Sequence, residues 1–308
     1  MIQILRTIAA LRAWRNGLPP DVRLGLVPTM GALHAGHMSL VDLARERCDT
    51  VIVSIFVNPL QFGPNEDLAR YPRPIESDIA MLEAAGVDAL FLPQAEELYP
   101  ADASTYVIEE AVSLPLCGAL RPGHFRGVAT VVLKLFNLTQ PHLAFFGQKD
   151  TQQCAVIERM VRDLNVPIEI VRGAIVREPN GLALSSRNAY LDASHRAVAP
   201  LLHQSLDAAR LAYEAGERDA AQLAAIGRAV LAREPRIEVQ YWEVRDRYSL
   251  APLETVEADG CLLAIAAILG DTRLIDNLCL GTGTPGGKQD HCARGVPGQH
   301  VLWLRRYG

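Results

Sequence analysis

The chain has 308 residues, of which 49% are hydrophobic and 21% charged, and its formal net charge is −5. This composition is ample for a buried core and excludes a disordered protein, and the length predicts about two domains. The basic residues form no block, so a nucleic acid is disfavoured as a partner. The six cysteines share no metal or disulfide spacing, and the longest apolar run, residues 261–269, is too short to span a membrane. We therefore expect a cytoplasmic protein with no membrane partner.

The first sixty residues predict a βαβ unit. After a helix over residues 7–15, the apolar run Leu24–Val27 predicts a buried strand. Residues 38–48 predict a helix, because their apolar positions recur at helical spacing, and residues 50–57 predict a second buried strand. Two strands with a helix between them predict a parallel sheet with helices on its faces.

The turn between the first strand and its helix reads Pro-Thr-Met-Gly-Ala-Leu-His-Ala-Gly-His over residues 28–37. It follows the carboxyl end of a strand, where α/β sheets bind their ligands. Its glycines, the free amides of a helix N-terminus, and His34 and His37 suit a nucleoside triphosphate. An ordinary Pro/Gly turn is the plain alternative. A zinc site is another, but the sequence has no CxxC and no HExxH-type helix to supply further ligands.

Polar turns recur along the first half of the chain. The second strand ends in Asn58–Gly63, which is either a ligand-facing turn or an ordinary Pro/Gly/Asn turn. A polar loop over residues 65–74, a helix over 75–85 and a strand over 88–92 follow, with a short edge strand expected at 105–108. Arg121 and His124 can bind phosphate, although loop residues of these types are more often only solvated.

A second glycine turn follows the strand over residues 142–146, which comes after an apolar helix over 128–138. This turn, Gly147–Gln153, precedes a helix over residues 154–164. Lys149 can meet phosphate charge, and Asp150 can meet a ribose hydroxyl or a metal. As the second such turn in a parallel sheet, it supports a nucleotide site.

The second half begins after expected strands at 168–171 and 174–176. The run Arg177–Asn188 contains two hydroxyls and a guanidinium, which suit a triphosphate because guanidinium binds phosphate bidentately. A Ser/Asn helix cap before Leu191 is the rival interpretation. Two Ala-rich helices, over 193–215 and 220–233, and three strands, over 237–244, 262–268 and 272–278, complete this half.

Together these elements predict an α/β fold with a Rossmann-like parallel sheet in residues 1–175 and a smaller α+β lid domain in residues 176–280. Residues 281–308 have a linker-like composition and are expected to form a flexible tail.

Five motifs, in order over the first 280 residues, carry a resemblance. They are the 28–37 turn with its HxGH signature, Phe56–Phe62, Arg121–Phe125, Phe146–Asp150 with Gln153, and Arg177–Asn188. HxGH alone indicates only the nucleotidyltransferase superfamily. The longer set resembles the pantoate–β-alanine ligase family. That resemblance implies ATP-dependent ligation of pantoate and β-alanine through a pantoyl adenylate, with Mg²⁺, in a homodimer.

The resemblance also implies roles for matched residues. His37, His34, Lys149 and Arg187 would be catalytic. Gln61 would hold pantoate and β-alanine, Gln153 would hold pantoate, and Arg121 would contact substrate. The ATP site would be lined by Met30, Gly31, Ala32, Leu33, His34, Ala35, Gly36, His37, Gly147, Gln148, Lys149, Asp150, Val176, Leu184, Ser185, Ser186 and Arg187.

Three positions depart from the family's usual pattern. The family usually has Glu at the position of Gln148, Asp at that of Asn180 and Met at that of Leu184. We expect these changes to affect affinity rather than function. A nucleotidyltransferase that makes a dinucleotide is the rival enzyme, and a nucleotide-binding regulator with a decayed site is the non-enzymatic alternative.

Overall fold

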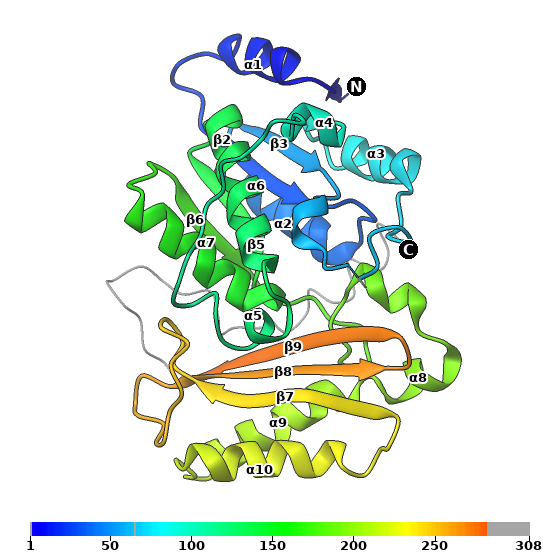
Figure 1. The fold of residues 1–308 in the computed structure, drawn as a ribbon, viewed down its shortest axis with the longest axis vertical. Coiled ribbons are helices and arrows are strands. Elements are labelled where there is room, and N and C mark those ends of the chain that lie inside the picture. The colour runs from blue at the N-terminus through cyan, green and yellow to red at the C-terminus, as the bar shows by residue number, and fades with distance from the viewer. Residues whose placement is uncertain (1, 65, 282–308) are drawn as a thin grey trace. The chain divides into compact units, whose positions relative to one another are not determined.

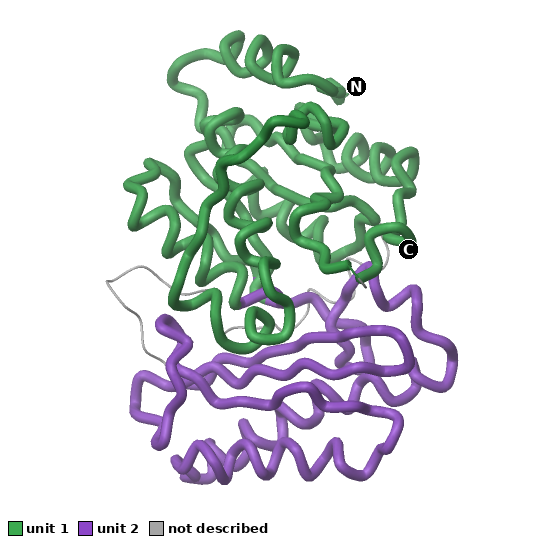
Figure 2. Tube along the Cα trace, viewed as in Figure 1, with its two compact units in different colours: residues 1–148, 152–173 green, residues 149–151, 174–308 purple. Residues whose placement is uncertain are grey.

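The computed structural model describes residues 2–64 and 66–281 (Figure 1). The chain forms two compact units (Figure 2). Unit 1 comprises residues up to 148 together with 152–173, and unit 2 comprises residues 149–151 together with those from 174 onward. The predicted tail falls almost entirely on residues 282–308, which lie outside the described residues.

Unit 1 is built on a six-stranded parallel sheet, which confirms the predicted Rossmann-like class. In spatial order its strands are β1 (Gln3–Leu5), β4 (Ala89–Phe91), β3 (Thr50–Ile55), β2 (Leu24–Thr29), β5 (Leu143–Gly147) and β6 (Glu169–Gly173). The chain leaves β2 toward β3 on one side, and β5 and β6 lie on the other. The order therefore reverses between β2 and β5, and a sheet of this type binds ligands at the carboxyl ends of the strands flanking such a point.

Helices cover this sheet and bury its apolar strands. The helices of this part of the chain are α1 (Ile8–Asn16), α2 (Ala35–Arg47), α3 (Ile75–Ala84), α4 (Ala95–Leu98), α5 (Cys117–Leu120), α6 (His124–Thr139) and α7 (Thr151–Asp163), with short 3₁₀ turns η1 (Pro59–Gln61) and η2 (Gln148–Asp150). α2 packs on β2 and β5 through Met38, Val41 and Ala44. Strand residues such as Leu26, Ile52 and Phe145 are fully buried, as expected for a parallel sheet covered by helices.

Unit 2 has an antiparallel sheet of β7 (Ile237–Arg245), β8 (Cys261–Leu269) and β9 (Thr272–Leu280). Helices α9 (Leu201–Glu214) and α10 (Ala220–Leu231) share an apolar core with this sheet, and α8 (Ala193–Val198) and η3 (Ser186–Tyr190) precede them. At the centre, Trp242 is fully buried and donates from Nε1 to the Ser205 hydroxyl at 3.0 Å. Its ring lies 2.2 Å from where a Cβ on Gly227 would be, so only glycine fits there.

Several expected elements differ in the structure. The helix predicted over 193–215 is two helices, which separate at Pro200, because proline has no amide hydrogen to continue the first. No strand forms at 105–108, where the Val107 amide donates to the Thr130 hydroxyl instead of to another strand. None forms at 174–176 either, and β1, three residues long, was not expected. In the described part of the chain, no helix is long and apolar enough to cross a membrane.

Candidate active site

The turn after β2 is closed by two histidines at the start of α2. His34 is the N-cap residue, with extended backbone, and its Nδ1 accepts the Gly36 amide at 3.1 Å. His37 Nδ1 accepts the His34 amide at 3.3 Å, and the two ring centroids are 4.1 Å apart. These bonds form a capping box, a role in which Ser or Thr and Glu are usual.

The box also decides where the imidazole protons lie. A ring nitrogen that accepts an amide hydrogen bond is unprotonated, so a neutral His34 or His37 carries its proton on Nε2. Both rings are therefore hydrogen-bond donors through Nε2, which suits an anionic ligand. The expectation of free amides at this helix N-terminus is wrong for His34 and Gly36, whose amides donate to the two rings.

The turn after β3 places Gln61 beside the first turn. Asn58, which is 1% exposed, caps η1, and its Nδ2 donates to Gln61 Oε1 and to the Gly127 carbonyl, both at 3.0 Å. Gln61 Nε2 in turn lies 3.0 Å from Met30 Sδ. Tyr99 donates its hydroxyl hydrogen to Asn58 Oδ1 at 3.0 Å. Asn58 thus fixes the Gln61 side chain. Its place at the end of a buried strand predicted a polar turn but did not identify this partner.

Arg121 lies in this same cluster. Its guanidinium makes two 2.6 Å contacts with the Glu66 carboxylate, and its Nη2 donates to the Gln61 carbonyl at 3.2 Å. His124 Nδ1 lies 2.8 Å from the same carbonyl. Burial alone raises the pKa of Glu66, but the hydrogen bond and charge of Arg121 outweigh it, so this pKa is below its usual value. Because the charge of Arg121 is paired, the geometry favours positioning of Gln61 over direct binding of phosphate.

The turn after β5 begins in unit 1 with Gly147 and Gln148. Gln148 is buried, and its Oε1 accepts a hydrogen bond from Arg172 at 3.2 Å. On α7, Gln152 is buried and its Oε1 accepts the Cys117 amide at 2.9 Å. Gln153, the residue matched to pantoate binding, is only half-buried. The two adjacent glutamines therefore differ in role. Gln152 supports α5, and Gln153 remains partly exposed and can contact a ligand.

Unit 2 contains Lys149, whose carbonyl accepts the Asn277 side-chain amide at 2.9 Å. Lys149 Nζ lies 3.8 Å from Asp150 Oδ2, and the lysine side chain is 21% exposed. Asn277 belongs to β9 and is almost fully buried. No local pattern marked Asn277 in the sequence, because its partner is 128 residues away.

The loop that follows β6 is held by a buried ion pair in the same unit. Arg177 donates to both carboxylate oxygens of Asp276, at 2.6 and 2.9 Å. The Leu184 amide donates to the Val176 carbonyl at 2.9 Å, and Ser185 Oγ accepts the Arg187 amide at 3.3 Å. Ser185 is therefore the cap of η3, as the rival interpretation of this run expected. This cap fixes the backbone of Ser186 and Arg187.

In unit 1, one group of turns contains Met30, His34, His37 and Gln61. Lys149 and the 184–187 loop belong to unit 2. Among the described residues, no group of three or more His, Cys, Asp or Glu could hold a metal, so the zinc interpretation gains no support.

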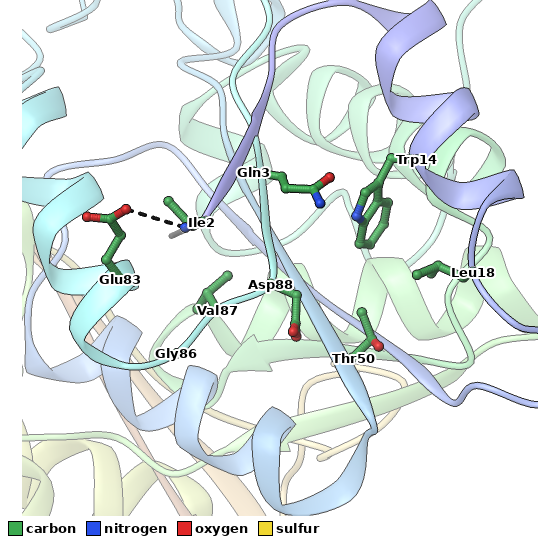
Figure 3. Close-up of a pocket in the computed structure, with 9 residues that line it drawn as sticks. All are labelled: Ile2, Gln3, Trp14, Leu18, Thr50, Glu83, Gly86, Val87 and Asp88. Atoms are coloured by element: carbon green, nitrogen blue, oxygen red, sulfur yellow. Dashed lines mark hydrogen bonds between the residues drawn. The ribbon is translucent and has the colours of Figure 1, made fainter.

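Figure 3 shows the residues that line a pocket of about 450 Å³ in unit 1. Its lining residues include Gln3, Thr50 and Asp88, which stand at or just before the amino ends of β1, β3 and β4. In a parallel sheet these ends are opposite to the carboxyl ends that carry the turns. No residue with a predicted role lines this pocket.

Comparisons with known proteins agree with each other. Residues 3–279 match the family model described as pantoate-beta-alanine ligase. The pantothenate synthetase of Chloroflexus aurantiacus is 56% identical to the chain, over 91% of this chain and 98% of that protein. The enzyme of that name from Geobacter sulfurreducens is 51% identical, over 91% and 99%.

Solved structures are similar over the same range. Pantothenate synthetase from Thermus thermophilus has a TM-score of 0.87 and 46% identity, covering 91% of this chain and 100% of that one. A pantoate-beta-alanine ligase from Francisella tularensis, complexed with beta-gamma ATP and beta-alanine, has a TM-score of 0.76 and 33% identity, covering 91% and 98%.

Proposed function

The chain belongs to the pantoate–β-alanine ligase family, and on that basis we propose that it makes pantothenate through an enzyme-bound pantoyl adenylate. In the first step, a carboxylate oxygen of pantoate attacks the α-phosphorus of ATP, and pyrophosphate leaves. In the second step, the neutral amine of β-alanine attacks the activated acyl carbon. The C–O bond to AMP then breaks, a proton leaves the nitrogen, and an amide remains.

The observation that carries this proposal is the histidine capping box. A carboxylate that attacks a phosphate needs no nucleophilic side chain, because the main cost is bringing two anions together and stabilising charge on the phosphate oxygens. The Nδ1 bonds of His34 and His37 leave each ring as a donor through Nε2. Preorganised donors of this kind stabilise charge as it develops.

Further groups would stabilise the negative charge that develops on the phosphate oxygens. Lys149 and Arg187 supply cations, and Ser185 and Ser186 supply hydroxyls for the phosphates. The backbones of Met30–His37, Gly147–Asp150 and Val176 would line the nucleotide, and the Asn277 bond supports the position of Lys149.

Pantoate would be held by two neutral amides. Gln61, fixed by Asn58 and Met30, and Gln153, half-buried on α7, can bind its hydroxyls without placing a negative charge beside its carboxylate. Gln61 would also lie near β-alanine. A neutral pocket of this kind lowers the repulsion that an acidic side chain would add.

We treat Mg²⁺ as part of the ATP substrate. The described residues offer no cluster of three or more metal-ligating side chains, and Mg²⁺ is often held by substrate phosphates and waters with few protein ligands. Asp150, near the phosphates in this proposal, can supply one oxygen. The proposal also includes a cytoplasmic location, because the reaction consumes ATP, which the cytoplasm supplies.

A homodimer is also proposed. Residues 103–110 run without regular structure, and Ile108 and Tyr106 on this segment are 64% and 41% exposed. Leu114 nearby is 61% exposed. Large exposed apolar side chains that recur within one short stretch of chain support a surface that a partner covers. Sedimentation of the chain and of its Ile108→Asp variant tests this, because a surface that pairs two copies should lose its dimer on that change.

The deciding experiment measures AMP and pyrophosphate from purified protein with ATP, Mg²⁺ and pantoate, with and without β-alanine. Release of AMP only when β-alanine is present supports ligation through an acyl adenylate. Pyrophosphate release that continues when pantoate is omitted would instead indicate another nucleotidyltransferase. Release of AMP also discriminates, because an enzyme that makes a dinucleotide keeps the nucleotide in its product. No turnover under any condition would favour a regulator with a decayed site.

A further inference from the structure

The turn that leads to the histidine box has a backbone that needs outside support. Gly31 has φ +84° and Ala32 has φ +51°. Glycine adopts positive φ readily, but alanine does so at a cost, because its Cβ approaches the following carbonyl oxygen. The two residues directly precede Leu33 and the cap residue His34. A change at Ala32 would therefore shift the start of α2.

The support comes from Asp78, 45 and 46 residues further along the chain. Asp78 lies in the first turn of α3 and is 1% exposed. Its Oδ2 accepts the Ala32 amide and its Oδ1 accepts the Leu33 amide, both at 2.8 Å. A Cβ on Gly31 would lie 3.1 Å from Asp78 Oδ2, so the carboxylate packs directly under the turn.

Only a carboxylate meets both amides. Two neighbouring amide hydrogens point at one side chain, and each needs an acceptor oxygen. An asparagine in the same place has one acceptor oxygen, while its NH₂ group would face the second amide, donor against donor. The N-terminal end of α3 stabilises the buried negative charge. Burial raises the pKa of Asp78, and the two amide bonds oppose that rise.

We propose that Asp78 is a positioning residue for the ligation: it fixes the backbone of residues 31–33 so that the rings of His34 and His37 are aimed at the phosphates. Asp78, 1% exposed and bonded to two backbone amides, is assigned no contact with a reacting atom. It acts through the turn, in the first half of the reaction, where charge develops on the α-phosphate. This inference rests on the proposed function, since it requires the histidine pair to act on ATP.

The experiment compares Asp78→Asn with a matched control, Asp88→Asn. Asp88 also holds a backbone amide, that of Val51 at 2.8 Å, but it lies at the amino end of the sheet, in the pocket of Figure 3. Both variants lose a carboxylate that accepts a backbone amide, so both should melt at a lower temperature than the wild type. Pantothenate formation and pantoate-dependent pyrophosphate release are measured well below both melting temperatures.

For Asp78→Asn we expect kcat to fall by about 10²-fold, the scale of a misplaced catalytic group, with the KM values for pantoate and β-alanine within about twofold of the wild type. Asp88→Asn should keep its kcat. Equal kcat values for the two variants would overturn the proposal, whether both are normal or both low. A wild type without ligase activity would instead overturn the proposed function.

Asp78→Glu covers the case in which Asp78→Asn does not fold. Glutamate keeps both acceptor oxygens and the charge but is longer by one methylene, so it should fold and push the turn out of place. Its kcat should lie between those of the wild type and Asp78→Asn. A folded Asp78→Glu variant with the kcat of the wild type would overturn the proposal.

Discussion

The ion pair between Arg177 and Asp276 offers a direct test of how unit 2 supports the loop that leads to residues 184–187, which are proposed to contact the phosphates. Asp276 is 3% and Arg177 15% exposed in their side chains. Asp276 accepts two bonds from the guanidinium and a third from the Asn277 amide at 2.7 Å. Asp276→Asn keeps the shape of the side chain but removes its charge, which leaves the Arg177 charge buried without its partner.

The expected cost follows from this burial. Removing one partner of a buried ion pair destabilises a protein by roughly 3–5 kcal/mol. Asparagine keeps one acceptor oxygen, so we expect the lower end, about 3 kcal/mol. At roughly 4 °C per kcal/mol for a domain of this size, the melting temperature of unit 2 should fall by about 12 °C. The loop leading to Ser185 and Arg187 loses an anchor, so kcat/KM for ATP should fall as well.

Urea unfolding followed by tryptophan fluorescence measures the first effect, and steady-state kinetics measure the second. Glu214→Gln is the control in the same unit, because the Glu214–Arg210 pair on α9 is exposed, with side chains 54% and 34% accessible. Such a pair contributes at most about 1 kcal/mol. A cost below about 1 kcal/mol for Asp276→Asn, equal to that of the control, would refute the reasoning from burial.

Three further outcomes are expected. His37→Ala should lower kcat by roughly 10²–10³-fold, the scale for loss of one preorganised donor, and a rate near that of the wild type would remove His37 from the mechanism. Because the pKa of Glu66 is lower in the folded chain than its usual value of 4.5, its pairing with Arg121 stabilises the protein above that pH and is lost as the pH falls through the folded pKa. Thermal melts should therefore show Glu66→Gln less stable than the wild type at neutral pH, with the difference vanishing as the pH falls below the folded-state pKa of Glu66. Asn277→Ala removes the bond to the Lys149 carbonyl, so kcat should fall with little change in the KM for pantoate, which kinetic assays at saturating ATP can check.

Local patterns in the sequence were sufficient for most of the fold. Buried parallel strands such as residues 24–29 and 143–147 are continuous apolar runs, and amphipathic helices repeat at helical spacing, so both leave a signal in neighbouring residues. The turn motif at residues 28–37 belongs to this class too, because its glycines, its histidines and its place after a strand are contiguous.

Other features depended on partners far away in the chain. Strand β1 is three residues long and exists because β4 pairs with it. The helix predicted across Pro200 was wrong for a local reason, since the alanine-rich periodicity outweighed a single proline in the pattern. The apolar pattern of β1 was too short to predict a strand, and the periodicity of residues 193–215 was too regular to show where the first helix ends.

The sequence by itself determined where the polar turns lie and predicts that they carry the chemistry, because the residue types in them are adjacent and their spacing is local. Only the tertiary structure decided what holds those turns. Asp78 reaches Ala32 across 46 residues, Asp276 reaches Arg177 across 99, and Asn277 reaches Lys149 across 128. Each of these supports is one hydrogen-bonding side chain whose role depends on a backbone group or an oppositely charged side chain that packing brings to it. A local sequence pattern cannot predict these contacts, because the two partners come together only when the chain folds.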